Sequence, residues 1–368
     1  MAGKPPFETV VATYGATVLR VCRAVLGPVD ADDAWSETFL AAMKAYPALP
    51  ADANVQAWLV RIAHRKAIDV TRAAARRAIP VAETPDTTAA AAADSRDLDL
   101  TNALSTLPAK QKQAVAYHHL AGLPYAEVAA GPRRQHRCRP TRRGRRHRHL
   151  ATLLSLRRRT ESWTPMSTYD LTSALMNAYA ASPEHLRRLH DRLATAAQGE
   201  GVLDVAYRTL DTPLGGLLLA GTERGLVKVA YAVQDHEQVL EELAATISPR
   251  VLLAPSRLDA AAREVEEYLA GLRRTFDLPL DLRLARGFRR DVLTHLQDIG
   301  FGQTASYAAL AAAAGSPKAF RAAGSACATN PLPIVVPCHR AILSNGRLGQ
   351  YVGGLDAKRT LLTLEQTA

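Results

Sequence analysis

The chain has 368 residues, of which 48% are hydrophobic and 22% charged, a composition that fits two or three folded domains and excludes a disordered or collagen-like protein. Its 46 lysines and arginines exceed its 35 acidic residues, and a net charge of +11 is typical of nucleic-acid-binding proteins. The excess is local, however. Residues 131–159 hold 12 arginines and no acidic residue, so the remainder is close to neutral.

The four cysteines, Cys22, Cys138, Cys327 and Cys338, include no C-x-x-C pair. A chain of this length can bury a core without disulfides, so we expect free thiols in a reducing compartment. No two cysteines have zinc-ligand spacing, so we expect no metal site. The first residues lack the pattern of a secretion signal, and no apolar run approaches membrane-spanning length. The sequence therefore predicts a cytoplasmic protein.

Apolar residues recur at helical spacing through residues 7–78, which are predicted to form a helical domain. Residues 79–100 are rich in alanine, threonine, aspartate and proline and are predicted to be a linker. Residues 101–130 are predicted to hold two short helices separated by Gly122. Residues 131–149 have no apolar periodicity, which predicts a disordered segment or an electrostatic arm.

A second helical pattern runs from Met166 to about Ala197, and short β-rich runs with turn signals between them then follow. Further helices are predicted near 235–247 and 257–270. From residue 288 the pattern is helical again, apart from proline- and glycine-rich loops. The predicted strands are 202–210, 215–221 and 226–232, with a strand-like run at 277–284.

Cys338 and His339 are the first candidates for chemistry. The cysteine lies between the apolar, strand-like run Pro333–Val336 and the helix-forming residues Ala341–Leu343. A thiol needs a base or positive surroundings to become a thiolate nucleophile. A bare Cys-His pair is more typical of a buried structural cysteine beside a surface histidine, so the neighbouring sequence has to decide between these interpretations.

Several neighbouring motifs occur in a consistent order. They resemble those of the O6-alkylguanine-DNA alkyltransferases, also called methylated-DNA–protein-cysteine methyltransferases, and the resemblance spans about residues 200–366. Residues 203–280 look like the smaller N-terminal strand domain of that family. The motifs are Phe288–Leu310 with its G-x-T-x-S-Y element, Gly315–Gly324, Asn330–Ile342 around Pro337-Cys338-His339-Arg340, and Gly349–Leu355 followed by Lys358, Leu361, Leu362 and Glu365.

The resemblance implies a single-turnover transfer in which the protein itself accepts the alkyl group, so no cofactor is expected. Cys338 would be the nucleophile, and His339 would act as its base through a bridging water. Glu365 would orient the histidine. Tyr307 would donate a hydrogen bond to the guanine ring, and Asn330 would brace the cysteine loop.

The resemblance also implies a base pocket and a DNA-binding helix. In the family, an arginine that matches Arg321 enters the duplex and fills the space of the extruded nucleotide, as reaction on a stacked base requires. The substrate pocket is expected from Tyr351, Val352, Gly353, Gly354 and Lys358, and DNA contacts are expected from Arg321, Ser316, Lys318 and Arg340.

The residues themselves are compatible with a helix-turn-helix in this region. The segment Thr304–Tyr307 can cap a helix that ends at Gly315. Ser316 is a suitable N-cap for a second helix, with Pro317 at its first position, and Arg321 is then expected about one turn into that helix.

Residues 7–78 carry a second resemblance, to region 2 of extracytoplasmic-function sigma factors. In that family this region binds the polymerase clamp and the −10 promoter strand, so core RNA polymerase becomes a possible partner through residues 7–78. Residues 104–130 resemble the beginning of region 4. The residues that carry the first match are Asp30–Leu40, Ala57–Ala63 and the basic helix Arg65–Arg77.

The region 4 pattern stops after Ala130. Two prolines and the lack of an apolar stripe exclude a promoter-reading helix directly after it. Two hypotheses remain for the arginine-rich segment. The first is a frameshift within 131–160 that fused a sigma gene to a transferase gene, with Met166 as a candidate start. The second is a natural arm that binds phosphates. DNA sequencing across codons 125–170 distinguishes them.

The predicted architecture is multidomain, with an all-α sigma-like part followed by an α+β alkyltransferase. The predicted function is repair of O6-alkylguanine, with O4-alkylthymine as a further candidate substrate, by a monomer that acts on double-stranded DNA. Two alternatives are a sigma-type transcription initiation factor and a non-catalytic reader of alkylated bases, the latter disfavoured by Cys338. The expected boundaries are 1–78, 79–100, 101–130, 131–165, 166–200 (helical lead-in), 201–285 (strand domain) and 286–368 (catalytic domain).

Overall fold

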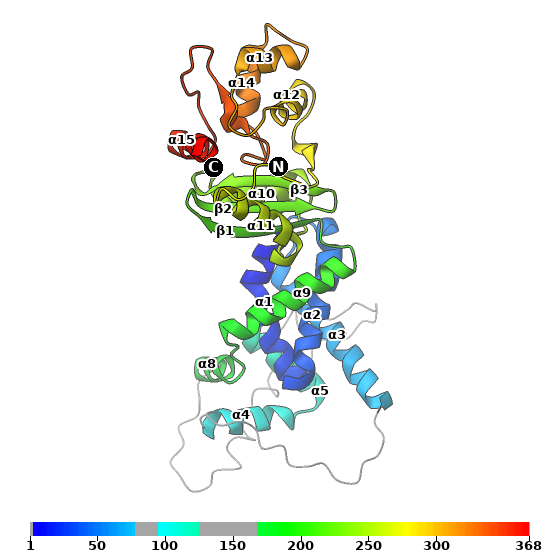
Figure 1. Ribbon diagram of the computed structural model, residues 1–368. Coiled ribbons are helices and arrows are strands. Elements are labelled where there is room, and N and C mark those ends of the chain that lie inside the picture. Colours follow the sequence, from blue (N-terminus) through cyan, green and yellow to red (C-terminus); the bar gives the residue numbers. More distant parts are fainter. Residues whose placement is uncertain (1–2, 78–94, 125–167, 368) are drawn as a thin grey trace. The chain divides into compact units, whose positions relative to one another are not determined.

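A computed structural model describes residues 3–77, 95–124 and 168–367. The chain divides into two compact units, one of Thr9–Ala196 and one of Met1–Glu8 with Ala197–Ala368 (Figure 1). The first is helical and the second combines a small mixed sheet with helices, which confirms the predicted fold class. Most of the predicted linker, the helix after Gly122 and the arginine-rich segment lie outside the described residues.

The helical unit is built around three long helices, α1 (Phe7–Leu26), α2 (Pro28–Ala45) and α3 (Val55–Arg77). Gly27, at φ +84°, separates the first two, and Pro28 starts α2 at a position where its missing N–H costs no hydrogen bond. The other described elements of this unit are the 3₁₀ turn Tyr46–Ala48, α4 (Ser95–Ser105), α5 (Ala109–Val115), the π-helical turn Ala116–Leu120, α8 (Thr168–Ala178) and α9 (Pro183–Gly199).

Two predictions for this unit need correction. The sequence suggested a linker up to residue 100, but α4 begins at Ser95, and Leu100 and Leu104 are buried in the core. The sequence also suggested that no run could span a membrane, whereas α1 is long and apolar enough by length and composition. Core helices of globular domains meet the same criterion, and Val21 and Ala24 of α1 lie in a buried cluster.

Helices α8 and α9 belong largely to the helical unit, although the sequence suggested a lead-in to the transferase. Leu175 of α8 is fully buried in the cluster that contains Leu104 and Tyr117. Polar contacts join the same elements: Arg192 of α9 pairs with Asp33 at 2.6 Å, and His185 lies 2.9 Å from Asp32. The Arg23 guanidinium donates to the Ala180 carbonyl at 2.7 Å.

In the second unit, four strands form a sheet in the order β3-β2-β1-β4. The first three are an antiparallel meander, and β4 pairs in parallel with β1. Helix α10 (His236–Thr246) buries Val239 and Leu243 in a cluster with residues of the sheet. The strands are β1 (Val205–Thr212), β2 (Gly215–Thr222), β3 (Gly225–Tyr231) and β4 (Val251–Leu253).

The run 277–284 was expected to be strand-like, but it forms only a bridge between Leu280 and Leu226 and a 3₁₀ turn, Leu282–Leu284. Two residues explain the difference. Pro279 has no N–H for a strand ladder, and the side chain of Asp281 accepts a hydrogen bond from the backbone of Arg283, which favours a turn. Before this run, α11 (Asp259–Leu269) contacts β1.

The last part of the chain packs α12 (Phe288–Leu296), α13 (Tyr307–Ala313) and α14 (Phe320–Ala328) together. The short strand β5 (Ala305–Ser306) pairs in parallel with β6 (Ala341–Ile342) and so fixes the start of α13 beside the end of the cysteine loop. Helix α15 (Gly354–Thr367) ends the described chain.

The turn between α13 and α14 differs in part from the expected geometry. The hydroxyl of Ser306 caps α13, and Gly315, at φ +74°, ends it, as the sequence suggested. However, the backbone N–H of Ala319 donates to the Ser316 carbonyl at 2.8 Å, which closes a separate turn. Helix α14 therefore begins at Phe320, and Arg321 is its second residue rather than one turn inside it.

Candidate active site around Cys338

The cysteine loop is buried along its whole length, from Asn330 to Ala341. It is not the strand that its apolar sequence suggested but a series of turns that ends in a 3₁₀ turn, Cys338–Arg340. Ile334 has φ +73°, which is strained for a β-branched residue. The backbone N–H of Val229, on β3, donates to the Pro331 carbonyl at 2.8 Å, so the sheet holds the start of the loop.

Asn330 orients the thiol. Its side-chain oxygen accepts from the backbone N–H of Leu332 at 2.9 Å, which fixes the direction of the amide. The amide nitrogen then donates to the Val336 carbonyl at 2.8 Å and to Cys338 Sγ at 3.1 Å. One buried side chain thus supports the loop and also stabilises negative charge on the sulfur, as a brace for a nucleophile requires.

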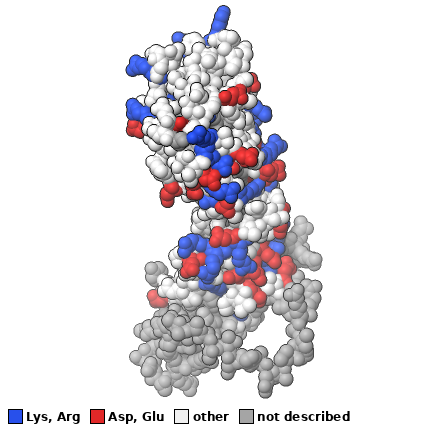
Figure 2. All heavy atoms as spheres, in the orientation of Figure 1, with Lys and Arg blue, Asp and Glu red and all other residues white. Residues whose placement is uncertain are grey.

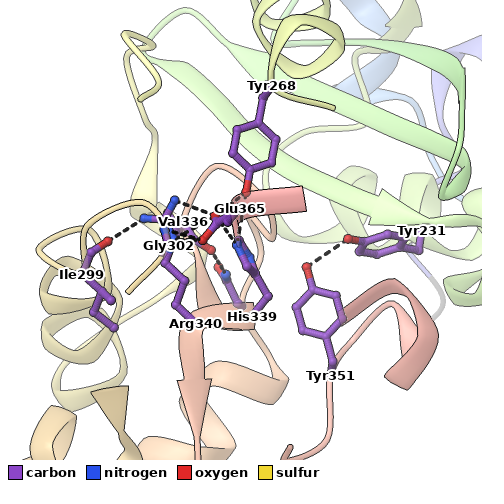
Figure 3. A network of polar contacts seen from close by, with 10 residues as sticks. Tyr231, Tyr268, Ile299, Gly302, Val336, His339, Arg340, Tyr351 and Glu365 are labelled. Carbon is purple, nitrogen blue, oxygen red and sulfur yellow. Dashed lines mark hydrogen bonds and ion pairs between the residues drawn. The ribbon is translucent and has the colours of Figure 1, made fainter. Parts of the chain in front are cut away.

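His339, which follows Cys338 in the chain, forms a buried pair with Glu365 (Figure 3). The histidine Nε2 lies 2.9 Å from Glu365 Oε1, and both side chains are almost inaccessible to solvent. A carboxylate can only accept, so Nε2 is the protonated nitrogen of the neutral ring. Nδ1 has no protein partner among the described residues although it is buried, which leaves it able to accept a proton.

Glu365 also binds Arg340, which the sequence placed among the DNA contacts. The Arg340 guanidinium donates to the carboxylate through Nε at 3.0 Å and Nη2 at 2.8 Å, and through Nη1 to the Ile299 carbonyl at 2.5 Å. It is buried on the inside of the domain. We therefore correct the prediction: Arg340 stabilises the carboxylate and is not placed to contact DNA.

The surroundings of Cys338 favour the neutral thiol. Burial raises its pKa to about 11, even though the Asn330 hydrogen bond and the charge of Lys358 act in the opposite direction. Burial likewise lowers the pKa of His339, partly offset by Glu365, so the imidazole is neutral at neutral pH. A neutral histidine beside a protonated thiol is the arrangement that general-base activation needs.

Glu365 remains ionised in spite of its burial. Burial alone would raise its pKa, but the hydrogen bonds from His339 and Arg340 lower the pKa to about 2. The backbone N–H of Gly302 donates to the second carboxylate oxygen at 3.1 Å. A fixed negative charge therefore faces the histidine and stabilises the imidazolium that forms when it accepts a proton.

Lys358 is fully buried on α15, and its ammonium group connects two loops of the site by hydrogen bonds. Nζ donates to the Ala341 carbonyl at 2.6 Å and to the Gly349 carbonyl at 3.4 Å, and it lies 6.0 Å from the centre of the Tyr307 ring. Burial lowers its pKa, partly offset by the nearby cysteine sulfurs. The contacts join the end of the cysteine loop to the following glycine-rich loop.

The glycine-rich loop lies close to two tyrosine rings. A Cβ on Gly353 would come within 2.6 Å of the Tyr231 ring, and one on Gly349 would overlap the Tyr307 hydroxyl. The hydroxyls of Tyr231 and Tyr351 are 2.9 Å apart, which links β3 to this loop. Val352 and Gly354 continue the same loop into α15.

The remaining predicted DNA contacts lie on the turn and the start of α14. Lys318 and Arg321 are exposed, and Ser316 is half-buried. The Arg321 guanidinium lies 5.8 Å from the centre of the Phe320 ring, which is itself 49% exposed. These side chains can reach a nucleic acid from outside, in contrast to Arg340.

Sequence reasoning missed two residues of the site, Tyr231 and Tyr268. Tyr231 lies at the end of β3, and Tyr268 lies on α11 with its hydroxyl against Glu365 and His339. Both come from the sheet region, far from Cys338 in sequence, and neither lies in a motif. Tyr231 lies on the same strand face as Val227 and Val229, and Tyr268 lies on the buried side of α11 with Val265 and Glu264, so local pattern did not single out either tyrosine. Among the described residues, no cluster of His, Cys, Asp or Glu could hold a metal ion.

Three segments of the chain match known family profiles. Residues 205–282 match the profile described as 6-O-methylguanine DNA methyltransferase, ribonuclease-like domain, and residues 287–367 match its DNA binding domain. Residues 10–77 match sigma-70 region 2.

One relative is a methylated-DNA–protein-cysteine methyltransferase of Mycolicibacterium paratuberculosis, 41% identical over 44% of this chain and 93% of its own length. This chain therefore belongs to the methylated-DNA–protein-cysteine methyltransferase family. It is also 35% identical to the bifunctional transcriptional activator/DNA repair enzyme Ada of Escherichia coli, over 53% of this chain and 56% of Ada. A solved structure of the Mycobacterium tuberculosis enzyme in complex with DNA shares 37% identity over 44% of this chain and 93% of that one, with a TM-score of 0.39.

Proposed function

We propose that this chain repairs DNA by moving the alkyl group of O6-alkylguanine onto the sulfur of Cys338. The observation that carries the proposal is the geometry at that sulfur: Asn330 donates to it, and the neighbouring His339 is paired with an ionised Glu365. Family membership supports the same reaction class. No group outside the chain is needed, because the thiol is the acceptor.

The proposed reaction begins with the thiol proton. It passes to Nδ1 of His339, through a bridging water, and Glu365 stabilises the resulting imidazolium. The sulfur then attacks the carbon attached to guanine O6, so a carbon–sulfur bond forms while the carbon–oxygen bond breaks. The product is a thioether, which water does not hydrolyse. Each protein molecule therefore acts once.

The leaving guanine takes up a proton in exchange for the one lost by the thiol. We propose that the Tyr307 hydroxyl donates to the guanine ring as negative charge develops there. Burial raises the pKa of Tyr307 to about 12, so the phenol is protonated and can donate. Lys358, close to the Tyr307 ring, adds a positive charge beside the pocket.

DNA recognition is proposed to use the start of α14. The target base must leave the duplex before a buried sulfur can reach it. Arg321 is exposed at the second position of α14 and is proposed to occupy the space of the extruded nucleotide, with Lys318 and Ser316 on the adjacent backbone.

A direct assay follows the loss of O6-methylguanine from a duplex oligonucleotide that is incubated with the full chain. We expect one base to be repaired per protein molecule. Cys338→Ala should abolish repair, while Cys327→Ala, a matched change at another buried cysteine of the same domain, should retain it. Repair by the Cys338→Ala chain would exclude the proposed nucleophile.

A second function is supported by the match of residues 10–77 to sigma-70 region 2. We propose that the helical unit binds core RNA polymerase and that the transferase is its fused partner. Pull-down of purified core polymerase with the full chain tests this proposal, and Lys66→Glu, at a half-buried lysine of α3 that pairs with Glu37, serves as a comparison. Lack of binding by the unmodified chain would contradict the proposal that the helical unit binds core RNA polymerase.

We also propose that the chain acts as a cytoplasmic monomer. The described cysteines, Cys22, Cys327 and Cys338, are free thiols, which suits a reducing compartment. Cell fractionation and analytical ultracentrifugation provide the tests, and a membrane-bound or dimeric species would contradict the proposal.

A further inference from the structure

Tyr268 brings a hydroxyl from the sheet region to the centre of the transferase site (Figure 3). Its side chain is fully buried on α11. The hydroxyl donates to Glu365 Oε1 at 2.5 Å and lies 3.2 Å from His339 Nε2. Its ring is held between Phe276, with centroids 5.1 Å apart, and Phe301, which meets it edge-on at 6.2 Å.

The direction of these hydrogen bonds follows from proton counting. Burial and the adjacent Glu365 raise the pKa of Tyr268 far above its usual value, so the hydroxyl keeps its single proton. That proton points to the carboxylate, because a carboxylate cannot donate. The phenol oxygen can therefore only accept from His339, and an acceptor at this place favours the ring form with a proton on Nε2.

We propose that Tyr268 is a positioning residue that, together with Glu365, holds His339 in the tautomer whose bare Nδ1 takes the thiol proton. This inference rests on the proposed alkyl transfer and adds a contribution of the sheet region to it. If the imidazole took the other tautomer, Nδ1 would carry a proton and could not act as the base.

Glu365 alone would hold the imidazole ring of His339 less firmly than Glu365 and Tyr268 together. Its Oε1 is shared by His339, Arg340 and Tyr268, so the bond to the imidazole competes with a charged donor. The phenol gives Nε2–H a second acceptor and occupies space that the ring would need to rotate. The charged and titratable groups that face His339 are Glu365, Lys358, Arg340, Cys338, Tyr351 and Tyr268.

The test compares the full chain with Tyr268→Phe, which removes only the hydroxyl. Tyr207→Phe, on β1 and outside the site, is the matched control. Single-turnover repair of an O6-methylguanine duplex is measured over a range of DNA concentrations. We expect the limiting rate of Tyr268→Phe to fall about tenfold, the lower end of the loss seen when the hydrogen-bond partner that orients a metal-binding histidine is removed, with half-saturation unchanged. The control should keep the original rate.

A second measurement reads the tautomer without any reaction. Nitrogen NMR of histidine-labelled chain, with the His339 signals assigned by their loss in His339→Gln, should show the Nε2–H form in the unmodified chain. Tyr268→Phe should show a mixture. An Nδ1–H form in the unmodified chain, or unchanged rate and tautomer in Tyr268→Phe, would overturn the inference.

The two proposals fail in different ways. If the unmodified chain repairs no DNA, the proposed function fails, while the NMR result still reports on Tyr268. If Tyr268→Phe does not fold, the Phe276→Leu chain takes its place in the NMR measurement. In Phe276→Leu the Tyr268 ring loses packing. Loss of protection of the His339 Nε2–H from solvent exchange in this variant would support the inference. Unchanged protection would contradict it.

Discussion

At the residue scale, the site combines a protonated, buried thiol with a neutral, buried histidine that we propose as its base. Burial raises the pKa of Cys338 to about 11, so little thiolate exists at neutral pH. The same burial shields the sulfur from small electrophiles in solution. His339, Glu365 and Arg340 form a connected buried group, and in the proposed reaction this group accepts the thiol proton as the substrate accepts the sulfur's electrons.

The first prediction concerns Glu365 and pH. Its pKa is about 2 in the folded chain against 4.5 as the ordinary value, so it stabilises the fold above pH 4.5 and this contribution is lost as the pH falls toward 2. Glu365→Gln cannot titrate. We expect the difference in free energy of unfolding between the two chains to shrink by roughly 3 kcal/mol over that range.

Denaturant unfolding at a series of pH values measures this difference. Carboxylates outside the site contribute equally to both chains and cancel. Two curves that stay parallel between pH 5 and pH 2 would show that Glu365 is not held ionised by its partners, contrary to the contacts at 2.8–3.0 Å from Arg340 and His339.

At the element scale, the site depends on loops held by the sheet region. β3 supports the start of the cysteine loop through Val229 and the glycine-rich loop through Tyr231. α11 adds Tyr268, and α15 adds Glu365 and Lys358. The sheet region therefore does more than cover the catalytic helices, because it fixes the two loops that carry the reacting groups.

The second prediction tests the packing of the glycine-rich loop. A Cβ on Gly353 would lie 2.6 Å from the Tyr231 ring, and overpacking of this kind costs about 1–3 kcal/mol. We expect Gly353→Ala to slow repair by displacing Tyr351. Adding Tyr231→Ala should recover part of the rate, whereas Tyr231→Phe, which keeps the ring, should not. Equal behaviour of the two double variants would contradict this account.

The third prediction concerns the place of α8. Leu175 is fully buried with residues of α4 and the π-helical turn, so Leu175→Ala should destabilise the helical unit by about 2–5 kcal/mol. Repair activity should be retained, because the transferase site draws no residue from α8. Circular dichroism during thermal unfolding and the repair assay measure the two effects. Leu171→Ala, on the same helix but only partly buried, should have a smaller effect.

Local patterns in the sequence predicted much of the fold and site. Helical spacing located α1, α2 and α3, turn signals located the three strands of the meander, and the family motif identified Asn330, Cys338, His339 and Glu365. The features that the sequence did not predict depend on contacts between segments that are distant along the chain. Tyr268 and Arg340 take their positions from burial against other elements, and α8 from a core that it shares with α4, none of which appears in local spacing.

At the scale of the whole molecule, the near-neutral charge outside the arginine-rich segment is the sum of regions with net charges of opposite sign. Residues 286–368 hold 9 basic and 4 acidic residues, whereas residues 201–285 hold 9 basic and 13 acidic. Acidic and basic side chains are interspersed on the described surface seen in Figure 2. Outside residues 131–159, which carry the net excess of the chain, a local positive balance of five charges (9 basic minus 4 acidic) lies in the region that matches the DNA-binding profile.

The fourth prediction separates DNA handling from chemistry. Arg321→Ala should slow repair of duplex DNA on the order of tenfold to a hundredfold, because an extruded base loses the side chain that replaces it. Transfer from free O6-alkylguanine base should be unchanged. Arg359→Ala, which removes another exposed arginine that pairs with Asp356, should change neither rate. A parallel loss of both activities in Arg321→Ala would assign the residue to folding or chemistry.

The mass of the protein after reaction tests most directly whether Cys338 is the alkyl acceptor. The full chain is incubated with excess duplex that carries one O6-methylguanine, and intact mass and peptide mapping are measured. We expect the gain of a single methyl group on the peptide that contains Cys338. An unchanged mass, or a methyl group on Cys327 or any other residue with Cys338 unmodified, would contradict it.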